Sequence, residues 1–180
     1  MDFLDLNNQE NLIEGIQLYK LIIHRDDRGL LMETLSTKWV GIVNESFPFG
    51  QTYFSVTNPG FARDESEWHN HPTKQIDRFV VLQGDVVIAA YDWRKDSPTY
   101  GILNLFFMGE SNKDDNQYLL LIPKNVLHST CNVGKKPLLY LGNPTHVYDS
   151  NEEGRIPFSE VNAKLHDGTL FSWQKVRDQF

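Results

Sequence analysis

The chain alternates between short apolar stretches and polar turns, and its hydrophobic positions do not recur at helical spacing over any long stretch. The apolar stretches are rich in β-branched and aromatic residues, which favour strands, and Gly, Pro, Asn and Asp separate them. This pattern predicts an all-β sandwich or barrel of many short strands with few short helices. We predict strands at residues 16–24, 30–35, 51–57, 76–82, 85–91, 102–108, 118–122, 126–132 and 137–141, and one more that carries His69.

The two ends of the chain show weaker patterns. Residues 1–14 are predicted to form a polar N-terminal lead-in, and residues 159–180 a C-terminal tail, with one short helix near residues 158–165. Residues 39–43 fit a short helix and a strand equally well. A length of 180 residues suits one domain with a sizeable core, and we see no internal repeat. We therefore expect a single domain over residues 1–180.

Composition and charge narrow the classes of partner. Hydrophobic residues make up 40% of the chain and charged residues 23%, which is ordinary for a folded protein. The net charge of -7 argues against nucleic-acid binding, which needs a basic face, although a few arginines suffice for a phosphorylated ligand. Cys131 is the only cysteine, so we expect no disulfide and no thiolate metal cluster, in a reducing cytoplasmic setting. We expect no signal peptide and no membrane-spanning stretch.

Ionisable side chains gather in residues 68–84 (WHNHPTKQIDRFVVLQG). His69 and His71 are two residues apart, so in a strand both imidazoles face the same way. In the next predicted strand Asp77 shares one face with the apolar Phe79 and Val81. We therefore expect Asp77 at the occluded end of a cavity that both histidines line. Ionisable groups on a buried face call for a functional explanation.

A third histidine, His128, extends this group. The H-x-H pair with Asp77 before Gly84 is similar to the first motif of the cupin superfamily, and residues 123–128 (PKNVLH) are similar to the second. The resemblance implies a cupin fold, the double-stranded β-helix or jelly-roll barrel, in which these residues converge. The histidines could hydrogen-bond to one another and to a substrate without any metal. Alternatively, one divalent transition metal ion could be held by His69, His71, Asp77 and His128.

Further motifs resemble one branch of this superfamily, the dTDP-4-dehydrorhamnose 3,5-epimerases. Residues 26–34 (DDRGLLMET) are similar to that family's D-x-R-G-x-x-x-E opening. Residues 92–101 (DWRKDSPTYG) resemble its D-x-R-x-x-S-P-T-x-G loop, and residues 122–128 its I-P-x-G-x-x-H. Gln51 and Ser55 fall on its Q-x-N-x-S strand. The similarities run in the family's order over most of the chain.

The resemblance implies an enzyme that inverts stereocentres beside the ketone of a nucleotide-linked 4-keto-6-deoxy sugar, as a homodimer and without a cofactor. A base removes the proton next to the carbonyl, an enolate forms, and an acid returns a proton to the opposite face. His69 matches the base, a role that suits a neutral imidazole, and Tyr140 matches the acid. Arg28 and Glu33 match residues that reach the nucleotide, partly across the dimer interface. The residues expected to bind substrate are Arg28, Glu33, Gln51, His71, Gln75, Asp77 and His128.

Several positions depart from the family pattern. The family's R-G-x-H is Ser66-Glu67-Trp68-His69 here, so a ligand-binding arginine is missing, and Arg63 could replace it. The family's lysine, which stabilises the enolate, is Asp77 here, and a carboxylate repels an enolate unless it is protonated or bound to a metal. The carboxylate partner of the base has no clear counterpart, and Asp178 matches it only loosely.

These departures leave two other functions open. One is a metal-dependent cupin enzyme of another reaction class, which metal analysis would separate from a metal-free epimerase. The other is a sugar-binding protein that keeps the barrel but has lost catalysis, which hydrogen-isotope exchange into a substrate would separate from an enzyme.

Overall fold

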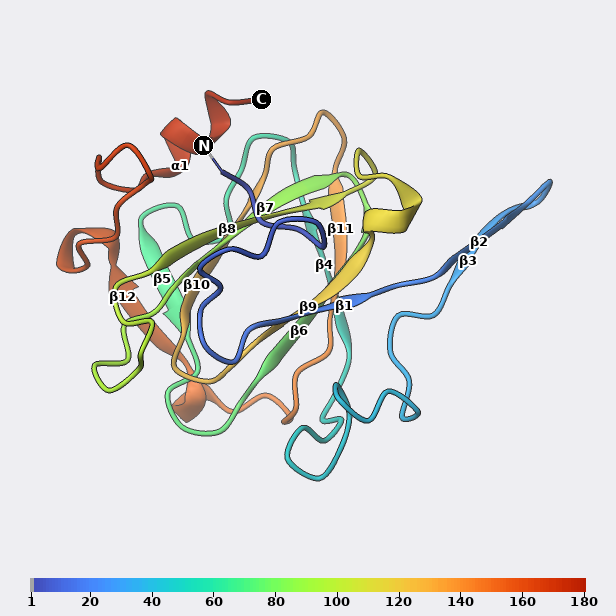
Figure 1. Ribbon diagram of the computed structural model, residues 1–180, viewed down its shortest axis with the longest axis horizontal. Helices are drawn as coiled ribbons and strands as arrows, with labels where there is room; N and C mark the ends of the chain where they lie inside the picture. The colour runs from blue at the N-terminus through green and yellow to red at the C-terminus, as the bar shows by residue number, and fades with distance from the viewer. Residues whose placement is uncertain (1) are drawn as a thin grey trace.

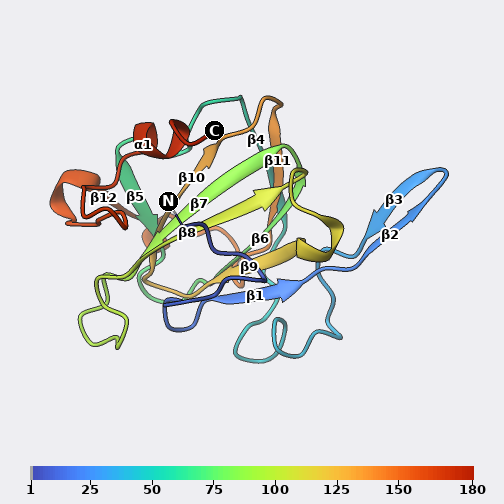
Figure 2. The same cartoon turned by 45° about the horizontal axis from the view of Figure 1, so that its top comes forward.

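Two antiparallel sheets of five strands each face one another and form a barrel, as the computed structural model shows for residues 2–180 (Figure 1 and Figure 2). The fold confirms the predicted all-β jelly-roll barrel. The first sheet contains, in spatial order, β1 (Gln17–Lys20), β9 (Tyr118–Ile122), β6 (Asp77–Gln83), β11 (Leu138–Gly142) and β4 (Tyr53–Thr57). The second contains β12 (Gly154–Pro157), β5 (Glu67–Asn70), β10 (Leu127–Asn132), β7 (Asp85–Tyr91) and β8 (Leu103–Gly109).

Apolar side chains from the inner faces of both sheets fill the barrel. Phe79 and Val81 of β6 meet Ile88 of β7 and Phe106 of β8 in one buried cluster. Burying each such side chain contributes roughly 1.5–3 kcal/mol, so this cluster holds the two sheets together. A second cluster lies outside the second sheet, where Trp68 stacks on Phe171 of the C-terminal tail.

A hairpin of β2 (Ile23–Asp26) and β3 (Gly29–Met32) projects from the barrel, as both ribbon views show (Figure 1 and Figure 2). The prediction of one strand over residues 16–24 was wrong here. β1 pairs with β9 and ends at Lys20, whereas β2 pairs only with β3. Leu21 is buried between them while its neighbour Ile22 is 67% exposed, so the chain leaves the core at this point.

The two ends of the chain pack onto the barrel more closely than expected. Leu4 and Ile13, within the predicted polar lead-in, are buried in the core, and Leu4 forms a bridge with Phe106. β12 was not predicted, and residues 39–43 form turns instead of a helix or strand. The only helices in residues 2–180 are η1 (Asp114–Asn116), η2 (Ser150–Glu152), η3 (Phe158–Glu160) and α1 (Trp173–Arg177). None of them is long and apolar enough to span a bilayer.

One buried arginine on β6 holds the long loop between β3 and β4 against the barrel. Arg78 is fully buried and donates hydrogen bonds to the carbonyl oxygens of Ile42 at 2.8 Å and Pro48 at 2.7 Å. Its Nε donates to the carbonyl of Asn143 at 2.7 Å. Because successive residues of a strand point to opposite faces, Arg78 points outward while Asp77 points into the barrel.

Candidate active site

Three strands bring the predicted ionisable residues together at one end of the barrel. His69 on β5 and His128 on β10 are directly paired across the second sheet. Asp77 begins β6 in the facing sheet, where it pairs with Ile122. His71 follows the end of β5. Residues that are distant in sequence therefore meet because the two sheets face each other.

These residues line a cavity of about 510 Å³. Its walls come from both sheets, so His69 and Tyr140 face the same space from opposite sheets. The expectation that Asp77 lies at the occluded end of this space agrees with its 3% exposure. The other lining residues are Tyr53, Phe54, Ser55, Val56, Arg63, Asp64, His71, Phe79, His128, Ser129, Thr130, Glu153 and Arg155.

Polar atoms crowd around the carboxylate of Asp77. Its Oδ2 lies 3.0 Å from Nε2 of His71 and 3.3 Å from Nε2 of His128. Gln75 donates from Nε2 to Oδ1 of Asp77 at 3.0 Å. Nε2 of His69 lies 3.1 Å from Nε2 of His71. The three imidazoles and the carboxylate thus form one contiguous group.

Backbone carbonyls fix two of the rings. Nδ1 of His71 lies 3.0 Å from the carbonyl oxygen of Glu152, and Nδ1 of His128 lies 3.1 Å from that of Val126. A carbonyl oxygen only accepts, so each Nδ1 donates and each Nε2 faces the cavity. The ring of His69 has no such support, because its buried Nδ1 has no hydrogen-bond partner among residues 2–180.

The carboxylate of Glu152 organises the turn between the histidine pair and Asp77. It accepts hydrogen bonds from the backbone N–H groups of Thr73 at 2.9 Å, Lys74 at 2.5 Å and Gln75 at 3.1 Å. The hydroxyl of Thr73 donates to the same carboxylate. Although burial opposes ionisation, these donors lower the pKa of Glu152 to about 2. Glu152 therefore holds both the turn and, through its carbonyl, the ring of His71.

The surroundings shift the pKa values of this group in different directions. Burial, together with the neighbouring imidazoles of His128 and His71, lowers the pKa of His69 to about 2, so its ring is neutral. Burial raises the pKa of Asp77, but hydrogen bonds with His128 and His71 outweigh it and hold the pKa below the ordinary value. Burial lowers the pKa of His71, but Asp77 raises it by more. Asp77 is therefore a carboxylate.

Tyr140 lies on β11 with its ring packed edge-on against Phe79, with the ring centroids 5.6 Å apart. Burial raises the pKa of its hydroxyl, so the phenol stays protonated. The side chain is 8% exposed and lines the cavity, so it is both part of the core and accessible from the site.

Some predicted site residues lie away from the cavity within this chain. Arg28 is at the turn of the projecting hairpin, where it pairs with Asp26. Glu33 follows the hairpin and is exposed. Gln51 accepts a hydrogen bond from the backbone N–H of Tyr148 at 3.3 Å. Of the predicted substrate-binding residues, only His71, Gln75, Asp77 and His128 gather around His69.

The sequence did not identify two charged groups of the site. Arg155 on β12 lies opposite His69 in the strand register and pairs with Asp64. The sequence analysis also did not predict Glu152, because its carboxylate binds the turn at Thr73, more than 70 residues earlier in the chain. The short stretch GRIP, a glycine followed by an arginine and an isoleucine, was the one local signal for β12.

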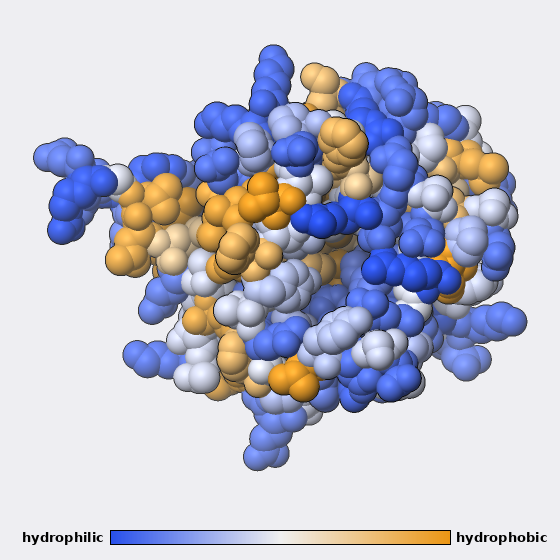
Figure 3. Space-filling view, turned by 180° about the vertical axis from the view of Figure 1, so that it is seen from behind, coloured by the Kyte–Doolittle hydropathy of each residue, from blue (hydrophilic) through white to orange (hydrophobic). Residues whose placement is uncertain are grey.

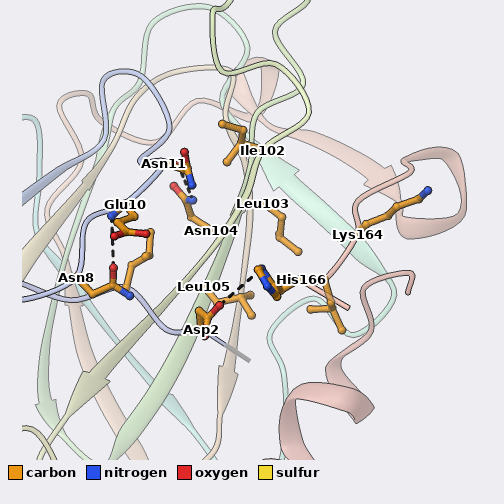
Figure 4. Close-up of a pocket in the computed structure, with 12 residues that line it drawn as sticks. Asp2, Asn8, Glu10, Asn11, Ile102, Leu103, Asn104, Leu105, Lys164 and His166 are labelled. Carbon is orange, nitrogen blue, oxygen red and sulfur yellow. Dashed lines mark hydrogen bonds and ion pairs between the residues drawn. The ribbon is translucent and has the colours of Figure 1, made fainter. Parts of the chain in front are cut away.

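A second cavity, of about 240 Å³, lies beside the N-terminal segment and β8 (Figure 4). Its polar groups bind one another: Asn104 accepts from the backbone N–H of Ile13 at 2.9 Å and donates to the carbonyl of Asn11 at 3.1 Å. His166 pairs with Asp2 at 3.6 Å. These contacts tie the N-terminal segment and the tail to the barrel, and the cavity contains none of the predicted site residues.

Comparison with known proteins agrees with the sequence motifs. The family model described as dTDP-4-dehydrorhamnose 3,5-epimerase matches residues 10–173. The probable low-salt glycan biosynthesis epimerase Agl13 of Haloferax volcanii is 33% identical over 164 residues, covering 86% of this chain and 97% of the relative. The spore coat polysaccharide biosynthesis protein SpsL of Bacillus subtilis is 34% identical over 162 residues, covering 89% and 99%. The crystal structure of a dTDP sugar isomerase from Desulfovibrio desulfuricans G20 matches with a TM-score of 0.73 at 26% identity, covering 90% of this chain and 92% of that one.

Proposed function

The chain belongs to the dTDP-4-dehydrorhamnose 3,5-epimerase family of sugar-nucleotide epimerases, and on that premise we propose how its cavity epimerises a nucleotide-linked 4-keto-6-deoxy sugar. The observation that carries the proposal is that His69 and Tyr140 face one cavity from opposite sheets. Inversion needs a base on one face of the sugar ring and an acid on the other, and two facing walls supply that arrangement.

His69 is the proposed base. Its ring is neutral because burial and the neighbouring imidazoles lower its pKa, so it can accept the proton beside the ketone. Tyr140 is the proposed acid, and its raised pKa keeps the proton that it must donate to the opposite face. Positioned acid–base groups of this kind contribute about 10²–10⁴-fold each to a rate.

Two arginines in the cavity wall suit the diphosphate of the substrate. Arg63 and Arg155 both line the cavity, and a guanidinium group can donate two parallel hydrogen bonds to phosphate. Arg63 fills the role that the missing arginine has in the family, as its place in the loop before β5 suggested. Arg155 forms an ion pair with Asp64. To bind the diphosphate, it must either leave this ion pair or contact Asp64 and the phosphate at the same time.

We place Arg28 in the site of a second subunit, within a homodimer. The hairpin that carries it extends away from its own barrel and exposes Ile22, Leu30 and Leu31, at 67%, 56% and 62%. Figure 3 shows hydrophobic side chains gathered on the projection, behind its hydrophilic tip. An exposed apolar surface of this kind marks an interaction site.

A reducing cytoplasmic setting remains our expectation, and the buried thiol of Cys131 fits it.

Hydrogen-isotope exchange tests the proposed activity directly. The protein is incubated in D2O with a dTDP-linked 4-keto-6-deoxy sugar, and deuterium beside the ketone is followed by NMR. We expect exchange, and we expect the His69→Ala variant to slow it by about 10²–10⁴-fold. If the wild-type protein exchanges no faster than His69→Ala, the proposed reaction is wrong and the sugar-binding alternative gains support.

A further inference from the structure

A glycine on β11 makes room for a second phenol beside Tyr140. Gly142 follows Tyr140 by two residues, so both positions face the same side of the strand. Gly142 pairs with Tyr53 of β4 on one side and with Phe79 of β6 on the other. A methyl group at Gly142 would lie 2.2 Å from Cζ and 2.5 Å from the hydroxyl oxygen of Tyr53. The ring of Tyr53 therefore occupies the space that a side chain at position 142 would need.

Tyr53 belongs to the wall of the cavity that faces His69. Tyr53 and Tyr140 line the cavity from the first sheet, whereas His69 lines it from the second. Tyr53 is 39% exposed, against 8% for Tyr140, so water reaches its side chain. Partial burial and the nearby carboxylate of Asp77 raise the pKa of Tyr53, so the phenol keeps its proton at neutral pH. Position 53 is an asparagine in the family pattern Q-x-N-x-S, so that pattern does not include this phenol.

The proposed substrate has two carbons that can be inverted, one on each side of the ketone. In a gluco-configured ring the hydrogens of these carbons lie on the same face, so one base on one wall can remove both in turn. Both replacement protons must then come from the opposite wall. An O–H group transfers its proton efficiently only when it points at the accepting carbon. Two phenols side by side on that wall can each be aligned with one carbon.

We propose that Tyr53 is a second acid, that Tyr140 and Tyr53 each protonate one of the two carbons, and that the protein therefore inverts both. In each inversion His69 takes the proton from one carbon and becomes an imidazolium, and the electron pair of the broken C–H bond moves into the enolate. The carbon forms its new C–H bond with the proton of one phenol, which leaves a phenolate. Proton exchange with water restores the phenol and the imidazole, so no other reactant is consumed. The inference rests on the proposed function, because it assigns a residue to that reaction.

The product of Tyr53→Phe tests this role. The variant removes only the hydroxyl and keeps the ring that packs over Gly142. It is incubated in D2O with dTDP-linked 4-keto-6-deoxy-glucose, and NMR assigns the deuterium and the configuration at each carbon beside the ketone. We expect the wild type to invert both carbons, and Tyr53→Phe to invert one at about the wild-type rate and the other about 10²-fold or more slowly. Tyr140→Phe should show the complementary loss, at the carbon that Tyr140 protonates.

A second variant displaces the phenol without removing it. In Gly142→Ala the added methyl group would lie 2.2 Å from the ring of Tyr53, so the ring must shift. We expect this variant to lose inversion at the same carbon as Tyr53→Phe. The control Tyr100→Phe, at an exposed residue outside the cavity, should keep both inversions. Melting temperatures check that each variant is folded, and Tyr53→Phe decides the question if Gly142→Ala is not.

The outcomes separate this inference from the proposed function. If the wild-type protein exchanges no deuterium, the proposed function fails and this inference fails with it. If the wild type inverts only one carbon, or if Tyr53→Phe inverts both at wild-type rates, the epimerase stands and the second acid is refuted. If Tyr53→Phe slows both carbons equally, Tyr53 binds or orients the sugar, and the assignment of one carbon to each phenol is wrong.

Discussion

The backbone carbonyl of Glu152 lies 3.0 Å from Nδ1 of His71, so a residue of η2 sets the ring orientation of a histidine 81 positions earlier in the chain. The carboxylate of the same residue holds the backbone of the turn that leads from His71 to Asp77. Glu152 therefore joins the late part of the chain to the centre of the site, and its replacement should affect both folding and chemistry.

We expect Glu152→Gln to lower the free energy of unfolding by about 1.5–3 kcal/mol, because charge-assisted hydrogen bonds to buried donors become neutral ones. The carbonyl that orients His71 remains, so the rate of isotope exchange should fall less than in His71→Ala. Urea denaturation and exchange kinetics measure the two effects. An unchanged unfolding midpoint would contradict the role of the carboxylate.

Tyr140→Phe should separate proton removal from inversion. His69 can still abstract the proton and return deuterium to the same face, whereas the donor on the opposite face is absent. We expect deuterium incorporation to continue while formation of the epimer falls by about 10²-fold or more. NMR of the sugar product reports both. Equal losses of exchange and inversion would show that Tyr140 does not act as the acid.

Mixing two inactive variants tests whether Arg28 acts in a neighbouring subunit. Arg28→Ala and His69→Ala should each be nearly inactive as homodimers. Unfolding and refolding them together in equal amounts should restore about a quarter of wild-type activity, because a mixed dimer has one complete site. Light scattering checks the dimer in each sample. No recovery in mixed dimers would place Arg28 with its own cavity or outside the site.

Asp92 predicts how stability responds to acid. It is fully buried and accepts hydrogen bonds from Arg94 at 2.9 Å and from Ser97 and Thr99 at 2.6 Å. Although burial opposes ionisation, these donors hold its pKa below the ordinary carboxyl value. Ionised Asp92 therefore contributes fully to the free energy of unfolding when the pH is above the pKa of an aspartate in the unfolded chain, near 4. This contribution is lost as the pH falls below that value.

The variant Asp92→Asn should be less stable than the wild type at pH 7 by about 2–3 kcal/mol. The difference should narrow steadily between pH 4 and pH 2, because protonation removes the same charge from the wild-type protein. Denaturation midpoints at several pH values measure this convergence. Parallel curves would show that the ionised form of Asp92 makes no special contribution.

The sequence predicted the barrel well because local signals and tertiary structure agree there. β7 and β9 match the predicted bounds of residues 85–91 and 118–122, since each is an apolar stretch that ends at polar residues or proline. Part of the histidine group was also predictable: the alternation along a strand suggested that His69 and His71 face one side, and the facing sheets bring Asp77 to the same cavity.

What the sequence did not predict depends on long-range contacts. Residues 16–24 read as one strand because every position tolerates extended backbone, and only pairing with β9 or with β3 divides them. β12 is too short for a periodic signal, yet its register puts Arg155 beside His69. The role of Glu152 cannot be derived from its neighbours in sequence, because the groups that it binds lie in another loop.

Asp77 and Arg78 are adjacent on β6 but belong to different parts of the molecule. The arginine fastens a loop on the outer face, whereas the carboxylate of the aspartate lies against His71 and His128 in the cavity. A change of charge at position 77 therefore acts on the histidines of the cavity, while the contacts of Arg78 with the loop lie on the other face of the strand. One substitution at position 77 can thus change the charge that faces the substrate. The adjacent residue, Arg78, still holds the loop between β3 and β4 against the barrel.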